Sequence, residues 1–204
     1  MDLSEKRNIL AIELEKSTLS ILKELGLPNS EFSIQIRQLE SKKGFVKHEN
    51  ITYAATKNGI DQVEFYISTN PGEPPKPLAK IASGGEVSRI MLALKSVLAD
   101  ADEIPVLVFD EIDTGISGRI ARVVGGQLQN VSEKHQIICI THLPQIASMG
   151  NAHYCVEKSI VDNRSQTHIR LLSQEERVSE IAKLLSGEET TESVMQSAKE
   201  LLES

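Results

Sequence analysis

The sequence predicts an α/β fold, with a mostly parallel sheet, flanking helices and one long helix in front of them. Two short, continuously apolar runs at 104–109 and 136–140 are typical of parallel strands that are buried on both faces. A segment of helical character at about 119–131 separates them, as the crossover of a parallel pair requires. Residues 3–25 are charged, rich in Leu and Ile and free of glycine and proline, which predicts the leading helix.

Length and composition are those of an ordinary globular chain. The 204 residues suffice for one domain with a sizeable core, or for a domain plus an appendage. Apolar residues make up 40% of the chain and charged residues 25%. No apolar run approaches the roughly 20 residues that span a bilayer, and the N-terminus MDLSEKRNIL lacks the layout of a secretion signal. We therefore expect a cytoplasmic protein.

Cysteine content and charge limit the possible partners. Cys139 and Cys155 have apolar neighbours and no CxxC spacing, which favours two reduced, buried thiols over a disulfide or a metal site. The net charge of −7 gives no overall footprint for nucleic acid, so a DNA contact requires a local patch or another part of the molecule. The aromatic content of 3% argues against a stacking platform for single strands.

The leading helix has an apolar seam that fits two structures equally well. Arg7, Ser17 and Glu24 interrupt a spacing of three to four residues, whose members are Leu3, Leu10, Leu14, Ile21 and Leu25. A plain amphipathic helix and the end of a coiled coil both produce this spacing. Gly26 and Pro28 predict the end of the helix.

Strand-like segments come next, at 32–39, 49–55 and 61–69. Lys57-Asn58-Gly59 predicts a hairpin turn that joins the last two of them. The segment 70–80 contains four prolines and a glycine, so we expect a stiff connector without regular structure.

The pattern then changes to α/β alternation. Apolar residues with helical spacing come first, at Val87, Ile90, Met91, Leu94, Val97 and Leu98. The two buried strands follow with the helix between them. Short strands near 153–158 and 167–172 and two further helices are expected to close the chain.

Two adjacent acids, Asp110 and Glu111, follow the first buried strand directly. Adjacent strand residues point to opposite faces, so the two carboxylates can do different work. One can bind Mg²⁺, and the other can orient and activate a water molecule. The carboxyl edge of a parallel sheet is also where open α/β sheets bind ligands. An Asp-Glu pair that only ends a strand and caps a turn explains these two residues equally well.

A glycine-containing segment, Ser83-Gly84-Gly85-Glu86, precedes the helix that contains Val87. Its backbone N–H groups, together with the positive end of the helix dipole, can bind a phosphate, and Ser83 can donate to a phosphate oxygen. An ordinary helix start, with Ser83 as N-cap and Glu86 completing a capping box, is the competing interpretation.

A histidine, His142, lies just past the second buried strand, so we expect it at the same sheet edge as Asp110. There it can hydrogen-bond a γ-phosphate or hold an attacking water, although a lone histidine more often only caps a strand. Asp113 follows the two acids and could shape the loop or reach across an interface.

Together these motifs resemble the C-terminal lobe of an ABC-type ATPase head. The resemblance implies that Ser83–Glu86 form the signature motif, which binds the γ-phosphate of a nucleotide held by the opposite subunit. Ala82 replaces the common leucine of that motif and Glu86 the common glutamine. The resemblance also implies roles for four other residues: Asp110 as the magnesium ligand and Glu111 as the water-handling acid of Walker B, Asp113 in the D-loop, and His142 as the switch histidine.

Longer segments are similar to the RecN family of bacterial SMC-like DNA repair proteins. They are NPGEPPKPLAKIASGGEVSRIMLALK, VLVFDEIDTGISGR and THLPQIAS. The similarity is close over about residues 60–160 and looser toward both ends. It implies that 1–27 form the end of a coiled-coil helix and 28–204 the C-terminal lobe of the head. It also implies a role in recombinational repair of DNA double-strand breaks, in the cytoplasm and associated with the nucleoid.

The phosphate-binding loop GxxxxGK[ST] of Walker A is absent from the sequence, and GGQLQN at 125–130 lacks the GK[ST] that would replace it. RecN-like proteins carry this loop in an N-terminal lobe, and two complete heads dimerise around two nucleotides. The resemblance therefore implies ATP and Mg²⁺ as cofactors of a complete head. It implies the other lobe, a second head and DNA as partners, and no membrane. We expect a fragment or split gene product that neither binds nor hydrolyses ATP measurably alone. Loss of the other lobe exposes sheet edge and apolar surface, which favours self-association or aggregation.

Other interpretations remain open. The lobe could be a docking or regulatory module without catalysis, and Glu111→Gln would then leave a complemented complex unaffected. A metal-dependent hydrolase that uses Asp110, Glu111 and His142 is disfavoured, because the sequence has no HxxxH or HxE pair.

Overall fold

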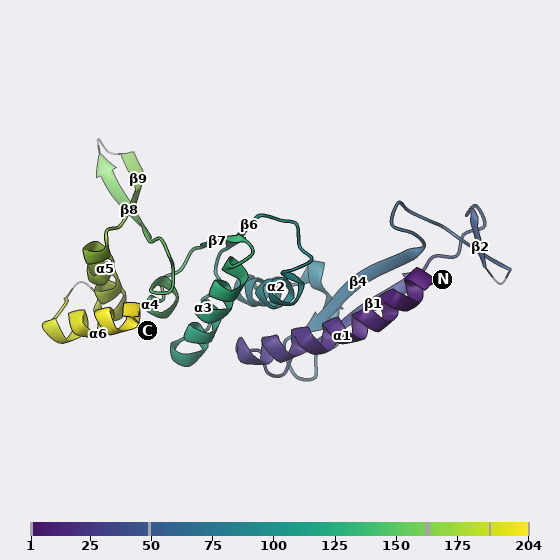
Figure 1. The fold of residues 1–204 in the computed structure, drawn as a ribbon, viewed down its shortest axis with the longest axis horizontal. Coiled ribbons are helices and arrows are strands. Elements are labelled where there is room, and N and C mark those ends of the chain that lie inside the picture. The colour runs from purple at the N-terminus through teal and green to yellow at the C-terminus, as the bar shows by residue number, and fades with distance from the viewer. Residues whose placement is uncertain (1, 49, 162–163, 188, 204) are drawn as a thin grey trace. The chain divides into compact units, whose positions relative to one another are not determined.

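A computed structural model describes residues 2–48, 50–161, 164–187 and 189–203 (Figure 1). The chain divides into two compact units, Met1–Leu98 and Ala99–Ser204, and each is considered by itself. Both units combine helices with small sheets, so the predicted α/β class is confirmed. Parallel pairing is limited to one strand pair in the described part of the chain, and the other ladders are antiparallel.

The first unit begins with the long helix α1 (Asp2–Glu24), which packs against strand β1 (Glu31–Gln38) and helix α2 (Gly84–Leu98). Acidic residues in its first turn and Lys23 in its last turn suit the helix dipole. The side chains that α1 buries are Ser4, Ala11, Thr18 and Leu22. In the first half of the helix, the buried face therefore consists of Ser4 and Ala11 and not of the predicted apolar residues Leu3 and Leu10.

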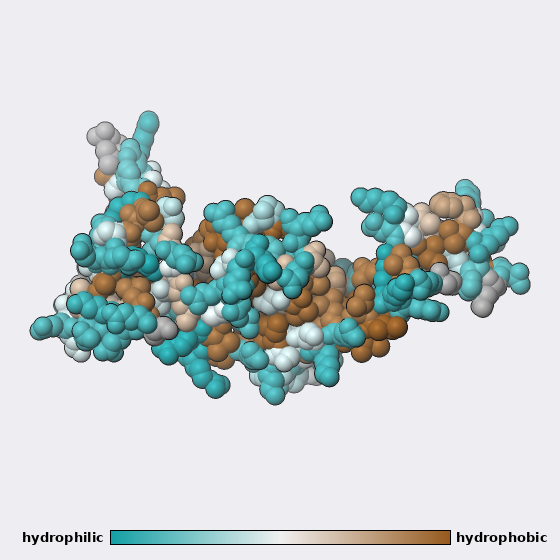
Figure 2. Space-filling view, in the orientation of Figure 1, coloured by the Kyte–Doolittle hydropathy of each residue, from teal (hydrophilic) through white to brown (hydrophobic). Residues whose placement is uncertain are grey.

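Exposed apolar side chains mark the first half of α1 instead. Leu3 and Leu10, two members of the predicted seam, are 54% and 61% exposed, and Ile9 and Ile12 are exposed as well. Figure 2 shows brown, hydrophobic surface over this helix. Ser4, Ala11 and Thr18 are small residues, which allow close packing, whereas the large apolar side chains at the start of the helix are exposed.

The sheet of the first unit has the strand order β1-β4-β5. Strand β4 (Asp61–Ser68) pairs antiparallel with β1 along eight residues, from Glu31↔Ser68 to Gln38↔Asp61. Strand β5 (Lys76–Pro77) and a 3₁₀ turn, η1 (Leu78–Lys80), lie within the connector, so the expectation of no regular structure was wrong for 76–80.

The predicted hairpin between 49–55 and 61–69 was also wrong. Strand β3 (Ile51–Tyr53) pairs with β2 (Val46–His48), whereas β4 pairs with β1. The turn itself forms: Thr56 and Gly59 exchange backbone hydrogen bonds of 2.9 and 3.1 Å, and Gly59 has a φ of +97°. The eight-residue ladder with β1 offers β4 more backbone hydrogen bonds than the three-residue β3 could supply.

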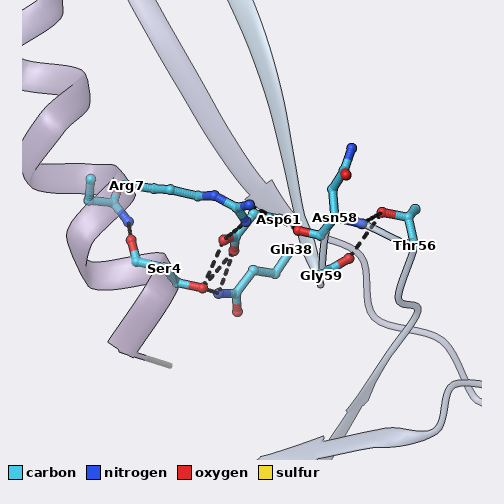
Figure 3. A network of polar contacts seen from close by, with 8 residues as sticks. Ser4, Arg7, Gln38, Thr56, Asn58, Gly59 and Asp61 are labelled. Carbon is cyan, nitrogen blue, oxygen red and sulfur yellow. Dashed lines mark hydrogen bonds and ion pairs between the residues drawn. The ribbon is translucent and has the colours of Figure 1, made fainter. Parts of the chain in front are cut away.

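A buried carboxylate connects α1 to the far end of the β1–β4 ladder (Figure 3). Asp61 accepts hydrogen bonds from Ser4 Oγ at 2.7 Å, Arg7 Nη1 at 2.7 Å and Gln38 Nε2 at 3.2 Å. Arg7 Nη2 also donates to the Asn58 carbonyl at 2.9 Å. Burial alone would raise the pKa of Asp61, but these hydrogen bonds and the Arg7 charge outweigh it and lower the pKa.

The second unit contains the parallel pair that the sequence predicted. Strand β6 (Val106–Phe109) pairs with β7 (Gln136–Cys139), and helix α3 (Gly118–Ser132) is the crossover between them. Strand β6 buries only the face that carries Leu107 and Phe109. On the other face, Val106 and Val108 are 41% and 62% exposed. The expectation that this strand is buried on both faces was wrong for this chain.

The rest of the second unit is a hairpin and three helices. Strands β8 (Tyr154–Val161) and β9 (Arg164–Leu171) form the antiparallel hairpin. The short α4 (Pro144–Ala147), which the sequence did not predict, packs against α3 and α5 (Gln174–Ser186). Ile181 and Ala182 of α5 and Ala198 of α6 (Glu192–Glu203) form a small core. No helix among the described residues is long and apolar enough to cross a membrane.

Candidate functional site

Two strand ends of the second unit meet at one edge. Phe109 of β6 and Cys139 of β7 are register partners, and the Ile140 amide donates to the Phe109 carbonyl at 2.9 Å. Because the strands are parallel, the residues that follow them emerge at the same carboxyl edge. The pairing therefore brings Asp110 and the segment around His142 to neighbouring strand ends, as the sequence predicted.

Asp113 joins the two loops that leave these strands. It is only 4% exposed, and its Oδ2 accepts from Thr141 Oγ1 at 2.6 Å and from the His142 amide at 2.9 Å. Thr141 Oγ1 in turn accepts from the Leu143 amide at 3.0 Å, so a short chain of bonds runs into the loop before α4. Asp113 thus shapes this edge from within the second unit.

The same carboxylate holds the ring of His142. Its Oδ2 lies 3.0 Å from His142 Nδ1, while 75% of the histidine side chain is exposed. An ionised carboxylate only accepts hydrogen bonds, so Nδ1 carries the proton in this contact. In the neutral ring Nε2 is then the acceptor nitrogen, and in the charged ring it is a second donor.

The acids Asp110 and Glu111 lie beyond the last residue of β6, in the turn that follows it. Glu111 has a φ of +56°, which is unusual for a non-glycine residue and costs about 1–3 kcal/mol. Its amide donates to Asp110 Oδ1 at 2.9 Å, and its carbonyl accepts from the Thr114 amide at 3.0 Å. Both residues are exposed. The strand-alternation argument therefore does not apply to them, because the turn sets their positions.

A half-buried thiol, Cys139, lies directly behind this edge. Burial, with smaller contributions from the charges of Asp113 and Asp110, raises its pKa to about 12. The thiol is therefore protonated at neutral pH, which makes it a poor nucleophile. Cys139 and the buried Cys155 are both free, as predicted.

The predicted phosphate-binding segment Ser83–Glu86 lies in the other unit. Ser83 directly precedes α2, and its carbonyl accepts from the Val87 amide at 3.0 Å, so it occupies the N-cap position. Ser83 and Gly84 are exposed and Gly85 is buried. The Glu86 carboxylate accepts from Thr69 Oγ1 at 2.9 Å, which fixes it toward the segment after β4.

Within the part of the chain that the structure describes, no group of three or more His, Cys, Asp or Glu residues could hold a metal ion. A hydrolase whose metal is held by Asp110, Glu111 and His142 together therefore has no support. The two exposed carboxylates offer oxygen ligands of the kind Mg²⁺ prefers, and Mg²⁺ usually takes its other ligands from water and phosphates.

One residue of this edge was missed from the sequence. Thr141 donates the shortest hydrogen bond to Asp113, whereas a role was predicted only for the histidine after it. Its position in the sequence could have predicted a role for Thr141, because it directly follows one apolar strand as the two acids follow the neighbouring strand.

Known proteins include relatives of the chain, although no family model matches it. The chain is 43% identical to the DNA repair protein RecN of Halalkalibacterium halodurans over 202 residues, covering 98% of this chain and 34% of that protein. It is 40% identical to RecN of Bacillus subtilis over 193 residues, covering 95% of this chain and 33% of that protein. The predicted resemblance to RecN is confirmed over nearly the whole chain, and the chain spans about a third of the length of these relatives.

Solved structures show the same fold. The Smc head domain of Pyrococcus furiosus, with an extended coiled coil and bound to the C-terminal domain of ScpA, matches with a TM-score of 0.51 at 19% identity. This match covers 89% of the present chain and 39% of that chain. The Smc head domain of Pyrococcus yayanosii, with a coiled coil and joint, matches with a TM-score of 0.50 at 19% identity over 95% of the present chain and 30% of that chain.

Proposed function

We propose that this relative of RecN proteins is the C-terminal lobe of a RecN-type, SMC-like ATPase head that acts in recombinational repair of DNA double-strand breaks. The observation that carries the proposal is the pair of parallel strand ends, with Asp110 and Glu111 after one strand and His142 after the other. The relatives are DNA repair proteins by name, and the fold is that of Smc heads. The protein would work in the cytoplasm at the nucleoid.

Each residue has a distinct role in this proposal. Glu111 orients or deprotonates the attacking water, and His142 contacts the γ-phosphate through its outward nitrogen. Asp113 is a positioning residue, because its buried carboxylate holds the histidine ring and the Thr141 hydroxyl. Positioning and charge stabilisation account for most of the catalysis in phosphoryl transfer.

In this proposal the chain contributes residues to two nucleotide sites, one of its own head and one of a second head. Asp110 provides a carboxylate for Mg²⁺, which when bound neutralises charge on the phosphates. Ser83, Gly84, Gly85 and Glu86 form the signature motif, which binds the nucleotide of a second head. The sequence contains no GxxxxGK[ST] loop, so the phosphate grip comes from a separate lobe. The partners are thus that lobe, a second copy of the head, and DNA.

Reconstitution tests the proposal. The chain is mixed with a separately produced N-terminal part of a RecN relative that carries GxxxxGK[ST], and ATP hydrolysis is measured for each part and for the mixture. We expect turnover only in the mixture. Glu111→Gln should lower turnover by roughly 10²-fold or more, as expected for loss of a general base, and should leave ATP-dependent assembly intact.

The exposed Glu133, at the end of α3, provides the matched control. Glu133→Gln makes the same chemical change and should leave turnover within about twofold, since surface changes away from a site have small effects. Hydrolysis by the isolated chain would refute the proposal. Normal turnover in the Glu111→Gln mixture would instead identify this lobe as a docking or regulatory module without catalysis.

A further inference from the structure

An exposed, lysine-rich segment of the first unit has no role in the nucleotide site. It comprises residues 41–57, here called the basic flap, and includes strands β2 and β3. Its four lysines, Lys42, Lys43, Lys47 and Lys57, are all exposed, its one acidic residue in the sequence is Glu49, and the exposed Glu40, bridged to Tyr53 of β3, adjoins it. The whole chain has a net charge of −7, so the flap is a local concentration of the opposite sign. None of the four lysines forms an ion pair with a carboxylate of the described residues.

The flap places two of these lysines on a tightly fixed turn. The Gly44 amide donates to the Ser41 carbonyl at 2.9 Å, and the Lys43 amide donates to Ser41 Oγ at 3.3 Å. A Cβ atom at Gly44 would lie 2.1 Å from the Tyr53 carbonyl oxygen, so only glycine allows the turn to lie against β3. Lys42 and Lys43 are therefore presented by a fixed backbone.

The strand after the turn continues the basic surface. Lys47 pairs with Thr52, and strand alternation places it on the face opposite Val46 and His48. Phe45, between Lys43 and Lys47, is 79% exposed, although a large aromatic side chain is normally at least partly buried. Figure 1 shows the flap beside the label β2, and Figure 2 shows hydrophilic surface along its outer rim.

We infer that the basic flap binds the phosphate backbone of duplex DNA, with Phe45 in contact with the sugar or base edges. Lysines without carboxylate partners on a fixed ribbon are suited to neutralising phosphates and releasing counterions. The choice of DNA among polyanions rests on the proposed function. A single exposed aromatic does not make the series of stacking faces that single-strand binding requires, so duplex is the form that fits.

Salt-dependent binding tests this inference. Fluorescence anisotropy of a labelled duplex of about 20 base pairs is measured with the chain at a series of salt concentrations, without nucleotide. Changing Lys42, Lys43 and Lys47 together to glutamine should weaken binding at least tenfold and reduce the slope of log K against log salt by roughly one per lysine. The control changes Lys134, Lys183 and Lys199 of the second unit to glutamine, which removes the same charge, and should weaken binding less than threefold.

A fluorescent reporter locates the contact independently. The chain has no tryptophan, so Phe45→Trp introduces a single tryptophan at the flap, which can be excited selectively over the three tyrosines. Ile160, on the β8–β9 hairpin, is also 79% exposed, and Ile160→Trp is the matched control. Duplex DNA should change the emission of the Phe45→Trp chain and leave that of the Ile160→Trp chain unchanged. Circular dichroism of each variant checks that the fold is kept.

Several outcomes would overturn the inference: no duplex binding at low salt, equal losses in the two lysine variants, or binding of anionic phospholipid vesicles in place of DNA. The test is separable from that of the proposed function. The flap variant, in the reconstituted mixture and without DNA, should hydrolyse ATP at the rate of the unchanged chain, because none of its altered residues lies in the nucleotide site.

Discussion

Asp61 is the buried carboxylate whose ionisation stabilises the first unit. Hydrogen bonds from Ser4, Arg7 and Gln38 hold its pKa below the usual 3.8. A lowered folded-state pKa stabilises the fold fully above the unfolded-state pKa, and this stabilisation is lost as the pH falls through the folded-state value. We expect Asp61→Asn to lower the free energy of unfolding by about 1–3 kcal/mol at pH 7, because Arg7 and Ser4 lose their charged acceptor.

Urea unfolding at pH 7 and in strong acid measures this effect. The difference between the unchanged chain and Asp61→Asn should shrink in acid, where Asp61 is protonated. Asp100 is the control, because its ion pair with Lys134 is at the surface and its side chain is 89% exposed. Asp100→Asn should change the unfolding free energy by less than about 1 kcal/mol at either pH. A loss for Asp61→Asn that stays constant with pH would contradict the assignment.

Individual residues were predictable from the sequence where a local pattern identified them. Asp110 directly follows one apolar strand and His142 lies just past the other, and the parallel register brings their positions to one edge. The role of Asp113 in holding Thr141 and His142 was not predictable, because those residues are 28 and 29 positions away. The hydrogen bonds of Asp61 were not predictable for the same reason, because its partners on α1 are 54 and 57 positions away. Hydrogen bonds across the fold leave no periodic signal in the chain.

Two helix starts of the second unit offer a matched test of capping. Ser173 caps α5 with a complete capping box, in which its Oγ accepts from the Glu176 amide and the Glu176 carboxylate accepts from the Ser173 amide. Ser117 occupies the same position before α3 and makes no side-chain cap hydrogen bond. We expect Ser173→Ala to cost about 1 kcal/mol in unfolding free energy and Ser117→Ala only a few tenths. Equal losses in urea unfolding would show that the box contributes nothing beyond the serine itself.

The longer helices and strands were predicted near their observed positions, and so was the parallel pair β6–β7, whereas β2, β5, α4 and the pairing of β4 were not. The sequence located β4 and the Lys57–Gly59 turn, but it joined β4 to the wrong neighbour. A turn sequence indicates pairing only between the segments next to it. Strand β4 pairs instead with β1, which begins 20 residues before β3 in the chain (Glu31 against Ile51). Similarly, α4 escaped prediction because four residues are too few to show helical periodicity.

The exposed face of β6 shows why burial of a strand on both faces could not be predicted from its apolar run alone. A continuous apolar run indicates that both faces of a strand prefer burial, and in this chain only the face with Leu107 and Phe109 obtains it. The chain spans about a third of the length of its RecN relatives. Val108 is 62% exposed and its register partner Ile138 is 47% exposed, and Val106 and Ile140 add to the same apolar surface.

Exposed apolar surface of this kind drives association. We therefore expect the isolated chain to self-associate in sedimentation velocity experiments, with a mass that rises with concentration. Changing Val108 and Ile138 to asparagine removes about 2 kcal/mol of apolar burial and should weaken self-association at least tenfold. The control is the exposed polar pair Lys158 and Thr167, register partners on β8 and β9, also changed to asparagine. A chain that stays monomeric at all concentrations, or equal weakening by both double variants, would show that the β6–β7 face does not govern association.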